Sequence, residues 1–300
     1  MKILIAGATG LIGKELVRQC HEAKMVVHYL TTRKEKIEQR PNYKGFYWNP
    51  SAGEIDQEAF EGVSVIINLA GASVSERWTR SYKIKILESR IMTAAVLFDS
   101  LKNIKHQVTH YISASGISIY PSSKQKHYSE DSTTVSDSFL GKVTVEWEAA
   151  ADRFSELNIA VAKVRIGIVL AKNGGALPQI VKPIAMRVGS ALGDGQQWQS
   201  WIHIEDIAGI FLFILNHKLS GVFNGVAPSP VTNEKMTKAI ATHLKKRLWM
   251  PKVPAFALKL LLGEMGSLAL ESQLVGAQKI EAEGYLFHYV NFEKAIDDLL

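Results

Sequence analysis

Short apolar runs alternate along this chain with longer segments of helical periodicity. The first run, KILIAG, ends in a glycine, and the apolar residues Leu11, Leu16 and Val17 then share one face of a predicted helix that ends near Ala23. Strands that alternate with helices indicate a parallel, doubly wound α/β sheet. The further predicted strands lie at 25–30, 64–70, 108–115 and 159–170, each separated from the next by a segment long enough for a crossover helix.

The last part of the chain has a different pattern. One more helix is predicted at 205–217 and one more strand at 221–226, and after Pro228 the pattern is helical with scattered Pro and Gly. We therefore predict a nucleotide-binding domain of the doubly wound class over residues 1–227, with 171–199 contributing to its substrate side. A smaller, mostly helical C-terminal subdomain is predicted over 228–300.

Composition and charge exclude several classes of protein. The 300 residues are 47% hydrophobic and 21% charged, as in folded globular proteins. Lys and Arg (35) exceed Asp and Glu (29), but they are dispersed, and the longest basic block is LKKR at 244–247. We expect a solvated surface that binds no nucleic acid, although a basic balance suits a small polyanionic ligand.

Cellular location is indicated by what the sequence lacks. Cys20 is the single cysteine, so no intramolecular disulfide forms, and burial as a small apolar side chain is its expected state. The chain begins directly with a strand, without a signal-peptide pattern, and its longest apolar run, Ile207–Leu215, is far shorter than the ~20 residues that span a bilayer. We expect a cytoplasmic monomer or homodimer that does not bind membranes.

The turn between the first strand and the first helix reads GATGLIG. Gly7, Gly10 and Gly13 are spaced so that the backbone turns tightly, leaves room for a pyrophosphate at the helix N-terminus, and packs the helix on the strand. A glycine-rich turn without a ligand is the alternative. Because the pattern lies in the first βα turn, we predict a dinucleotide site.

The end of the second strand predicts which dinucleotide binds. An acidic residue there holds the ribose 2′-hydroxyl of NAD, whereas a 2′-phosphate requires cations and hydroxyls. Here Thr32, Arg33 and Lys34 follow the strand, and the planar guanidinium of Arg33 suits a phosphate. We predict NADP(H) as the cofactor, with a solvated basic turn as the alternative, and we predict no metal site.

Longer motifs carry a family resemblance. The chain resembles the extended short-chain dehydrogenase/reductase superfamily, and more narrowly an atypical epimerase-family branch with a C-terminal domain of unknown function. This resemblance implies an NADP-binding Rossmann fold and no particular substrate. The motifs are GATGLIG, NLAG (68–71), SASGISIY (113–120), SRIMT (89–93), NGGALPQI (173–180) and LGDGQQWQSWIHIED (192–206).

Several residues acquire roles from this resemblance. It implies that Leu69, Ala70 and Gly71 pass close to the adenosine ribose, and that Ser113 and Ser115 line the nicotinamide side. The phosphate turn would comprise Gly7, Thr9, Gly10, Leu11, Ile12 and Gly13. Ser115 is the hydroxyl expected to touch a substrate oxygen, the alternative being that it caps its own turn. Farther along, His203 is a candidate for a polar pocket and Asp206 for a helix N-cap.

The superfamily's catalytic pair is missing. That pair is a Tyr and a Lys four residues later on one helix, where the lysine lowers the pKa of the phenol. In DSFLGKVTVEWEAAA the aligned residues are Phe139 and Val143, and Lys142 is interpreted as the partner of Glu146 in an exposed ion pair.

Two functional hypotheses remain. The first is an NADP-dependent oxidoreductase or nucleotide-sugar-epimerase-like enzyme with a small-molecule substrate, in which Tyr120, assisted by Ser115, donates the proton. The second is a non-catalytic NADP(H)-binding regulatory module with a link to cell division. An aromatic-lined pocket is a further expectation, which rests on Trp78, Trp147, Trp198 and Trp201.

Overall fold

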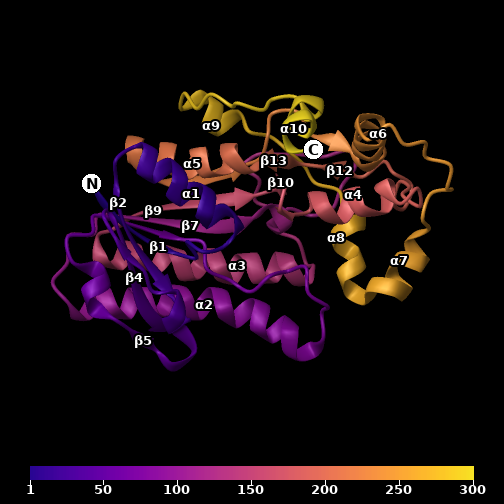
Figure 1. The fold of residues 1–300 in the computed structure, drawn as a ribbon. Coiled ribbons are helices and arrows are strands. Elements are labelled where there is room, and N and C mark those ends of the chain that lie inside the picture. The colour runs from indigo at the N-terminus through magenta and orange to yellow at the C-terminus, as the bar shows by residue number, and fades with distance from the viewer.

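A large, mainly parallel sheet lies between two layers of helices in the computed structural model, which describes residues 1–300 (Figure 1). Its parallel strands follow the order β4-β2-β1-β6-β7-β9-β14. This is the Rossmann strand order with one strand added at the end, so the predicted fold class is confirmed. The strands are β1 (Lys2–Ala6), β2 (Val26–Thr31), β4 (Tyr43–Asn49), β6 (Val65–Asn68), β7 (His110–Gly116), β9 (Ala160–Ile166) and β14 (Gly221–Gly225).

Each face of this sheet is covered by a pair of helices. Helices α1 (Leu11–Glu22) and α5 (Ile204–His217) cover one face, and α2 (Arg80–Asn103) and α3 (Phe139–Asp152) cover the other (Figure 1). Cys20 of α1 is fully buried under the first layer, and burial raises the pKa of its thiol to about 12. It is therefore an unreactive apolar side chain, as predicted.

The structure corrects two predicted features of the sheet. Strand β4 was not predicted, and no α-helix lies between β2 and β4. The predicted strand at 159–170 is broken at Gly167, where a Cβ would stand 2.3 Å from the Ser200 carbonyl oxygen. Beyond that glycine, β10 (Ile168–Ala171) leaves the large sheet and pairs with β13 (Trp201–His203).

A third apolar core lies beside the large sheet, between α4 (Leu177–Ala185), α6 (Asn233–His243) and α10 (Phe292–Leu299). Residues before and after position 228 both build this core, and the predicted domain boundary stays a prediction. The remaining helices are α7 (Ala255–Leu262), α8 (Ser267–Leu270) and α9 (Gln278–Ala282). The short strands are β3 (Gln39–Arg40), β5 (Glu54–Ile55), β8 (His127–Tyr128), β11 (Gly174–Gly175), β12 (Trp198–Gln199), β15 (Val231–Thr232) and β16 (Leu274–Val275). None of the helices has the combined length and apolar character needed to cross a lipid bilayer.

The start of α5 differs from the prediction. His203, not Asp206, is the N-cap, since its ring nitrogen Nδ1 accepts the Glu205 amide at 3.2 Å. Asp206 is fully buried and accepts hydrogen bonds from the Tyr285 hydroxyl and from the amides of His288 and Tyr289. The carboxylate therefore anchors a C-terminal segment to α5, which no local sequence pattern could reveal.

Candidate functional site

A pocket opens at the carboxyl ends of β1, β2 and β6. In open α/β sheets ligands bind where the strand order reverses, and here β1 has β2 on one side and β6 on the other. The cavity measures about 720 Å³. Its lining comes from the first βα turn (Gly7, Thr9, Gly10), the end of β2 (Leu30 to Arg33, and Lys36), the end of β4 (Trp48 to Ser51), the loop Leu69–Gly71, and α2 (Ser81, Ile84, Lys85, Glu88, Ser89, Met92, Thr93).

The three glycines of the first turn are required by different steric constraints. Gly7 has φ +87°, and a Cβ there would stand 2.9 Å from the Leu69 backbone. A Cβ on Gly13 would stand 2.1 Å from the Gly7 carbonyl oxygen, so Gly13 is required for packing. A Cβ on Gly10 would have one close neighbour, the Gly7 carbonyl oxygen at 3.2 Å, and Gly10 lines the pocket. Of the three, Gly10 is therefore the glycine whose missing side chain leaves space for a ligand.

Helix α1 begins at this space without a side-chain cap. Gly10 is its N-cap residue and supplies no side-chain acceptor, whereas Thr79, Ser138 and Thr232 cap α2, α3 and α6 through their hydroxyls. The first amides of α1 are thus available to an anion. The turn fits the diphosphate of a dinucleotide.

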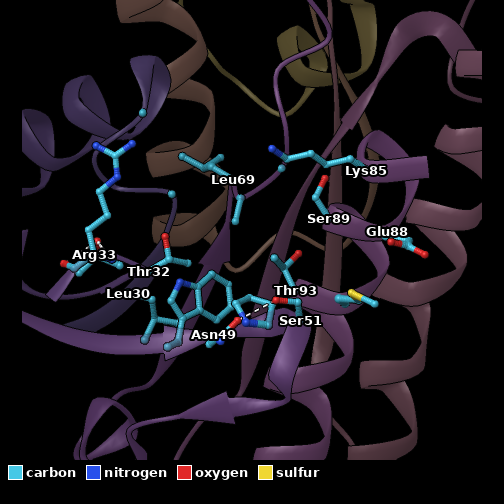
Figure 2. Close-up of a pocket in the computed structure, with 18 of the residues that line it drawn as sticks. Leu30, Thr32, Arg33, Asn49, Ser51, Leu69, Lys85, Glu88, Ser89 and Thr93 are labelled. Atoms are coloured by element: carbon cyan, nitrogen blue, oxygen red, sulfur yellow. Dashed lines mark hydrogen bonds between the residues drawn. The ribbon is translucent and has the colours of Figure 1, made fainter. Parts of the chain in front are cut away.

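Cations line the end of the pocket at β2. Arg33 is exposed, and its amide is held at 3.2 Å by the Thr31 hydroxyl. Figure 2 shows Arg33 and Lys85 on opposite sides of the cavity, with Glu88 on the α2 side. Glu88 is the one acidic residue of the lining, so no carboxylate faces the pocket from the end of β2.

Only some of the predicted cofactor residues line the pocket. The pocket is lined by Gly7, Thr9, Gly10, Thr32, Arg33, Leu69, Ala70 and Gly71. Lys34 instead lies over the Tyr47 ring, with Nζ 4.8 Å from its centroid. Leu11 lies against Gly174 and Gly175, and Ser113 donates to the Ala114 carbonyl at 2.9 Å. Ile12 packs on the apolar core, and Gly13 lies against the first turn.

The sequence interpretation missed two parts of the lining. The WNPS segment at 48–51 spans the last two residues of β4 and the two residues after it, and it escaped prediction because that strand was not predicted. The residues of α2 were missed because no chemistry was assigned to this helix, including the SRIMT motif, which contains Ser89, Met92 and Thr93. A spacing of Ser81, Lys85, Glu88 and Met92 on one helical face was the available signal.

The two predicted catalytic hydroxyls belong to a buried polar network. Ser115 donates to the Glu148 carboxylate at 2.7 Å, and Arg165 binds the same carboxylate through two nitrogens at 2.8 and 2.9 Å. Arg165 also donates to the Tyr120 hydroxyl at 2.9 Å, which donates to Asn224 at 2.8 Å. Tyr120 is fully buried and Ser115 is 3% exposed. Neither side chain lines the large pocket.

The charges in this network stabilise one another. Burial opposes ionisation of Glu148, but the hydrogen bonds and charge of Arg165 outweigh it and lower the pKa of the carboxyl. The Glu148 carboxylate likewise raises the pKa of Arg165 against the effect of burial. Burial raises the pKa of Tyr120, in spite of the opposing charge of Arg165. The network is therefore a buried ion pair with two attached hydroxyls.

The two residues at the positions of the missing catalytic pair have apolar surroundings. Val143 is buried beside Leu140 and Ile86, and the Phe139 ring contacts Trp78 edge-on, with 5.2 Å between centroids. Lys142 and Glu146 are both exposed, and no ion pair joins them, so that interpretation was wrong.

His203 and the tryptophans have mostly structural surroundings. His203 is 1% exposed, stacks on Tyr289, and has a pKa lowered by burial. Trp201 is fully buried against Phe292, and Trp147 lies under the guanidinium of Arg90. Of the four tryptophans singled out, Trp78 alone lines either of the two main cavities.

Comparisons with known proteins agree with this architecture. An epimerase family protein of Staphylococcus aureus (strain MRSA252) is 35% identical over 300 residues, which cover 99% of this chain and 98% of that protein. The crystal structure of human epimerase family protein SDR39U1 (isoform 2) with NADPH has a TM-score of 0.86 and 26% identity, and covers 100% of this chain and 99% of that one. UDP-glucuronic acid 4-epimerase from Bacillus cereus, solved with UDP-glucuronic acid and NAD, shares the fold at 16% identity and a TM-score of 0.80, covering 100% of this chain and 98% of its own.

Two family descriptions match separate parts of the chain. Residues 253–299 match a domain of unknown function, DUF1731. Residues 3–225 match the NAD dependent epimerase/dehydratase family. The resemblance to an epimerase-family branch with an uncharacterised C-terminal domain is thereby confirmed, and the chain belongs to the NAD dependent epimerase/dehydratase family.

Proposed function

We propose that this protein binds NADP(H) in the large pocket and acts as an oxidoreductase or epimerase-like enzyme on a small molecule. The proposal is carried by the charges at the end of β2. Arg33 and Lys36 line the cavity there, and no carboxylate faces them. An acidic side chain at this place would bind the 2′-hydroxyl of NAD and repel the 2′-phosphate of NADP. The human relative crystallised with NADPH supports the same choice.

The chain's own residues suit each part of the cofactor. Gly10 and the uncapped amides of α1 would hold the diphosphate, and Arg33, with Thr32, would hold the 2′-phosphate. Ala70 and Gly71 leave the backbone of their loop open to a ribose. When bound, NADP(H) supplies or accepts a hydride. We assign no proton-transfer step to Tyr120 or Ser115, because both hydroxyls are buried and already have partners.

The test is a pair of titrations with NADPH and NADH, followed by cofactor fluorescence. We expect NADPH to bind at least about tenfold more tightly, which corresponds to about 1.4 kcal/mol. Arg33→Asp should abolish this preference. Arg40→Asp is the matched control, since Arg40 is an exposed arginine outside the pocket that pairs with Glu38. Equal affinities for both cofactors in the native protein would contradict the proposal.

A non-catalytic NADP(H)-binding regulatory module is the second candidate. It is favoured by the apolar residues Phe139 and Val143 at the catalytic positions and by the burial of Tyr120. A broad panel of carbonyl compounds, each incubated with the NADPH-loaded protein, separates the two candidates. Oxidation of NADPH with any compound supports an enzyme, and its absence throughout the panel favours the module.

A further inference from the structure

A second cavity lies next to the cofactor pocket. It measures about 460 Å³ and is lined by Trp78, Arg80, Lys83, Ile84, Leu87, Phe139 and Glu264. Ile84 lines both cavities, so the two spaces share a wall on α2. Residues 80, 83, 84 and 87 form one stripe of that helix, and 81, 85, 88 and 92 form the adjoining stripe. One helix therefore carries side chains toward both spaces.

Aromatic and aliphatic side chains dominate the walls of this second cavity. The rings of Trp78 and Phe139 meet edge to face at 69°, and Ile84 and Leu87 add aliphatic surface. Such walls bind flat apolar groups. Phe139 occupies the position where the superfamily has its catalytic tyrosine, so the substitution that removed a proton donor also supplied an apolar wall.

The charges around the cavity leave one cation free. Lys83 lies over the Phe139 ring at 4.6 Å and is paired with Glu264 at 2.5 Å. Arg80 is exposed and forms no ion pair. With the charge of Lys83 neutralised by Glu264, Arg80 gives the lining a net charge of about one positive unit and a planar donor fork for a carboxylate.

We propose that this cavity is the substrate pocket and that it takes a flat apolar group bearing a single negative charge, such as an aromatic carboxylate. The identification as a substrate pocket rests on the proposed redox function, whereas the ligand class rests on the walls and on Arg80. A nucleotide sugar carries a diphosphate with at least two negative charges, and the single free cation does not match it.

The experiment measures binding of 2-naphthoate to the full-length protein by calorimetry, with and without saturating NADPH. We expect saturable one-site binding that persists when NADPH is present, because the two ligands occupy adjacent cavities. The alcohol 2-naphthylmethanol and the cation 2-naphthylmethylamine should bind at least about fivefold more weakly, since they lack the charge that pairs with Arg80. UDP should also bind more weakly than 2-naphthoate.

Variants locate the bound probe. Arg80→Glu should weaken 2-naphthoate binding at least about tenfold, and Phe139→Ala should weaken it about threefold to tenfold. Arg247→Glu is the matched control, because Arg247 is exposed, forms no ion pair and lies outside both cavities. Circular dichroism confirms that each variant is folded, and Phe139→Leu, which keeps the apolar packing, replaces Phe139→Ala if that variant is not folded.

The outcomes separate this inference from the proposed function. If the native protein does not bind NADPH, the proposed function is overturned. The 2-naphthoate titration would still report on the class of ligand that the second cavity binds. The inference is overturned if NADPH binds but 2-naphthoate displaces it, or if neither Arg80→Glu nor Phe139→Ala changes the affinity for 2-naphthoate. Tighter, Arg80-dependent binding of UDP would overturn the single-charge class.

Discussion

The pocket at the first βα turn and the network around Glu148 are both built at the carboxyl ends of parallel strands, but they differ in exposure. In the pocket, Arg33 and Lys85 face open space, and the amides of α1 have no side-chain cap. In the network, the Glu148 carboxylate, the Arg165 guanidinium and the Tyr120 hydroxyl satisfy one another below the surface. Unused hydrogen-bonding capacity marks a place for a ligand, whereas satisfied capacity marks a structural role.

The first test of this comparison is Arg165→Met. It leaves Glu148 buried with the more distant Lys163, at 3.8 Å, as its remaining cation, and removing one partner of a buried ion pair costs about 3–5 kcal/mol. We expect the free energy of unfolding, measured with urea, to fall by about that amount. The double variant Arg165→Met with Glu148→Leu should recover part of the loss. A loss below about 1 kcal/mol would show that the network does little for stability.

The second test uses pH. Because the pKa of Glu148 is lowered in the folded protein, its stabilising effect is present above the unfolded-state pKa of about 4.3 and is lost as the pH falls through the folded-state value. Glu148→Gln should therefore be about 3 kcal/mol less stable than the native protein at pH 7, and this difference should narrow in acid. Urea unfolding of both proteins from pH 7 to pH 3 measures the narrowing. A difference that does not change with pH would show that folding leaves the pKa of Glu148 unchanged.

The third test addresses the pocket. Gly10→Val places a branched side chain in the space next to the α1 amides, so NADPH affinity should fall at least about a hundredfold, equivalent to about 2.7 kcal/mol. The backbone at Gly10 has φ −77°, which any residue adopts, and the one close contact of a Cβ there is the Gly7 carbonyl oxygen at 3.2 Å, so Tm should fall less than in Gly13→Val. Gly13→Val is the contrasting variant and should destabilise the fold itself. Unchanged NADPH binding in folded Gly10→Val would show that the turn is only structural.

The fourth test is Tyr120→Phe, and it decides between the two roles given to this residue. As a member of the network, Tyr120 contributes hydrogen bonds to Asn224 and Arg165, so its replacement should cost about 1 kcal/mol of stability. If Tyr120 were a general acid, its replacement would lower the turnover of an identified substrate about 10²–10⁴-fold while NADPH affinity stays intact. We expect only the loss of stability, measured by urea unfolding. A rate loss of about 10²–10⁴-fold would contradict the purely structural role of Tyr120.

Local patterns predicted the parts of the fold that depend on local sequence. The alternation of strands and helices, the turn at Gly7 and the basic end of β2 are each set by residues that are close to one another in the sequence. The strand at Tyr43–Asn49 escaped prediction because Lys44, Gly45 and Asn49 interrupt its apolar residues. The surroundings of Tyr120 could not be predicted, since Arg165 and Asn224 are 45 and 104 residues away along the chain.

The anchor at Asp206 has a consequence for synthesis. Its carboxylate lies fully buried in α5 and receives its hydrogen bonds from Tyr285, His288 and Tyr289. A ribosome completes every strand of the large sheet well before it reaches those donors. Until they emerge, the nascent α5 carries a carboxylate without its partners at the edge of an otherwise formed core. The segment between α9 and α10 therefore completes the fold after the sheet, and a chain released before residue 285 lacks all three donors.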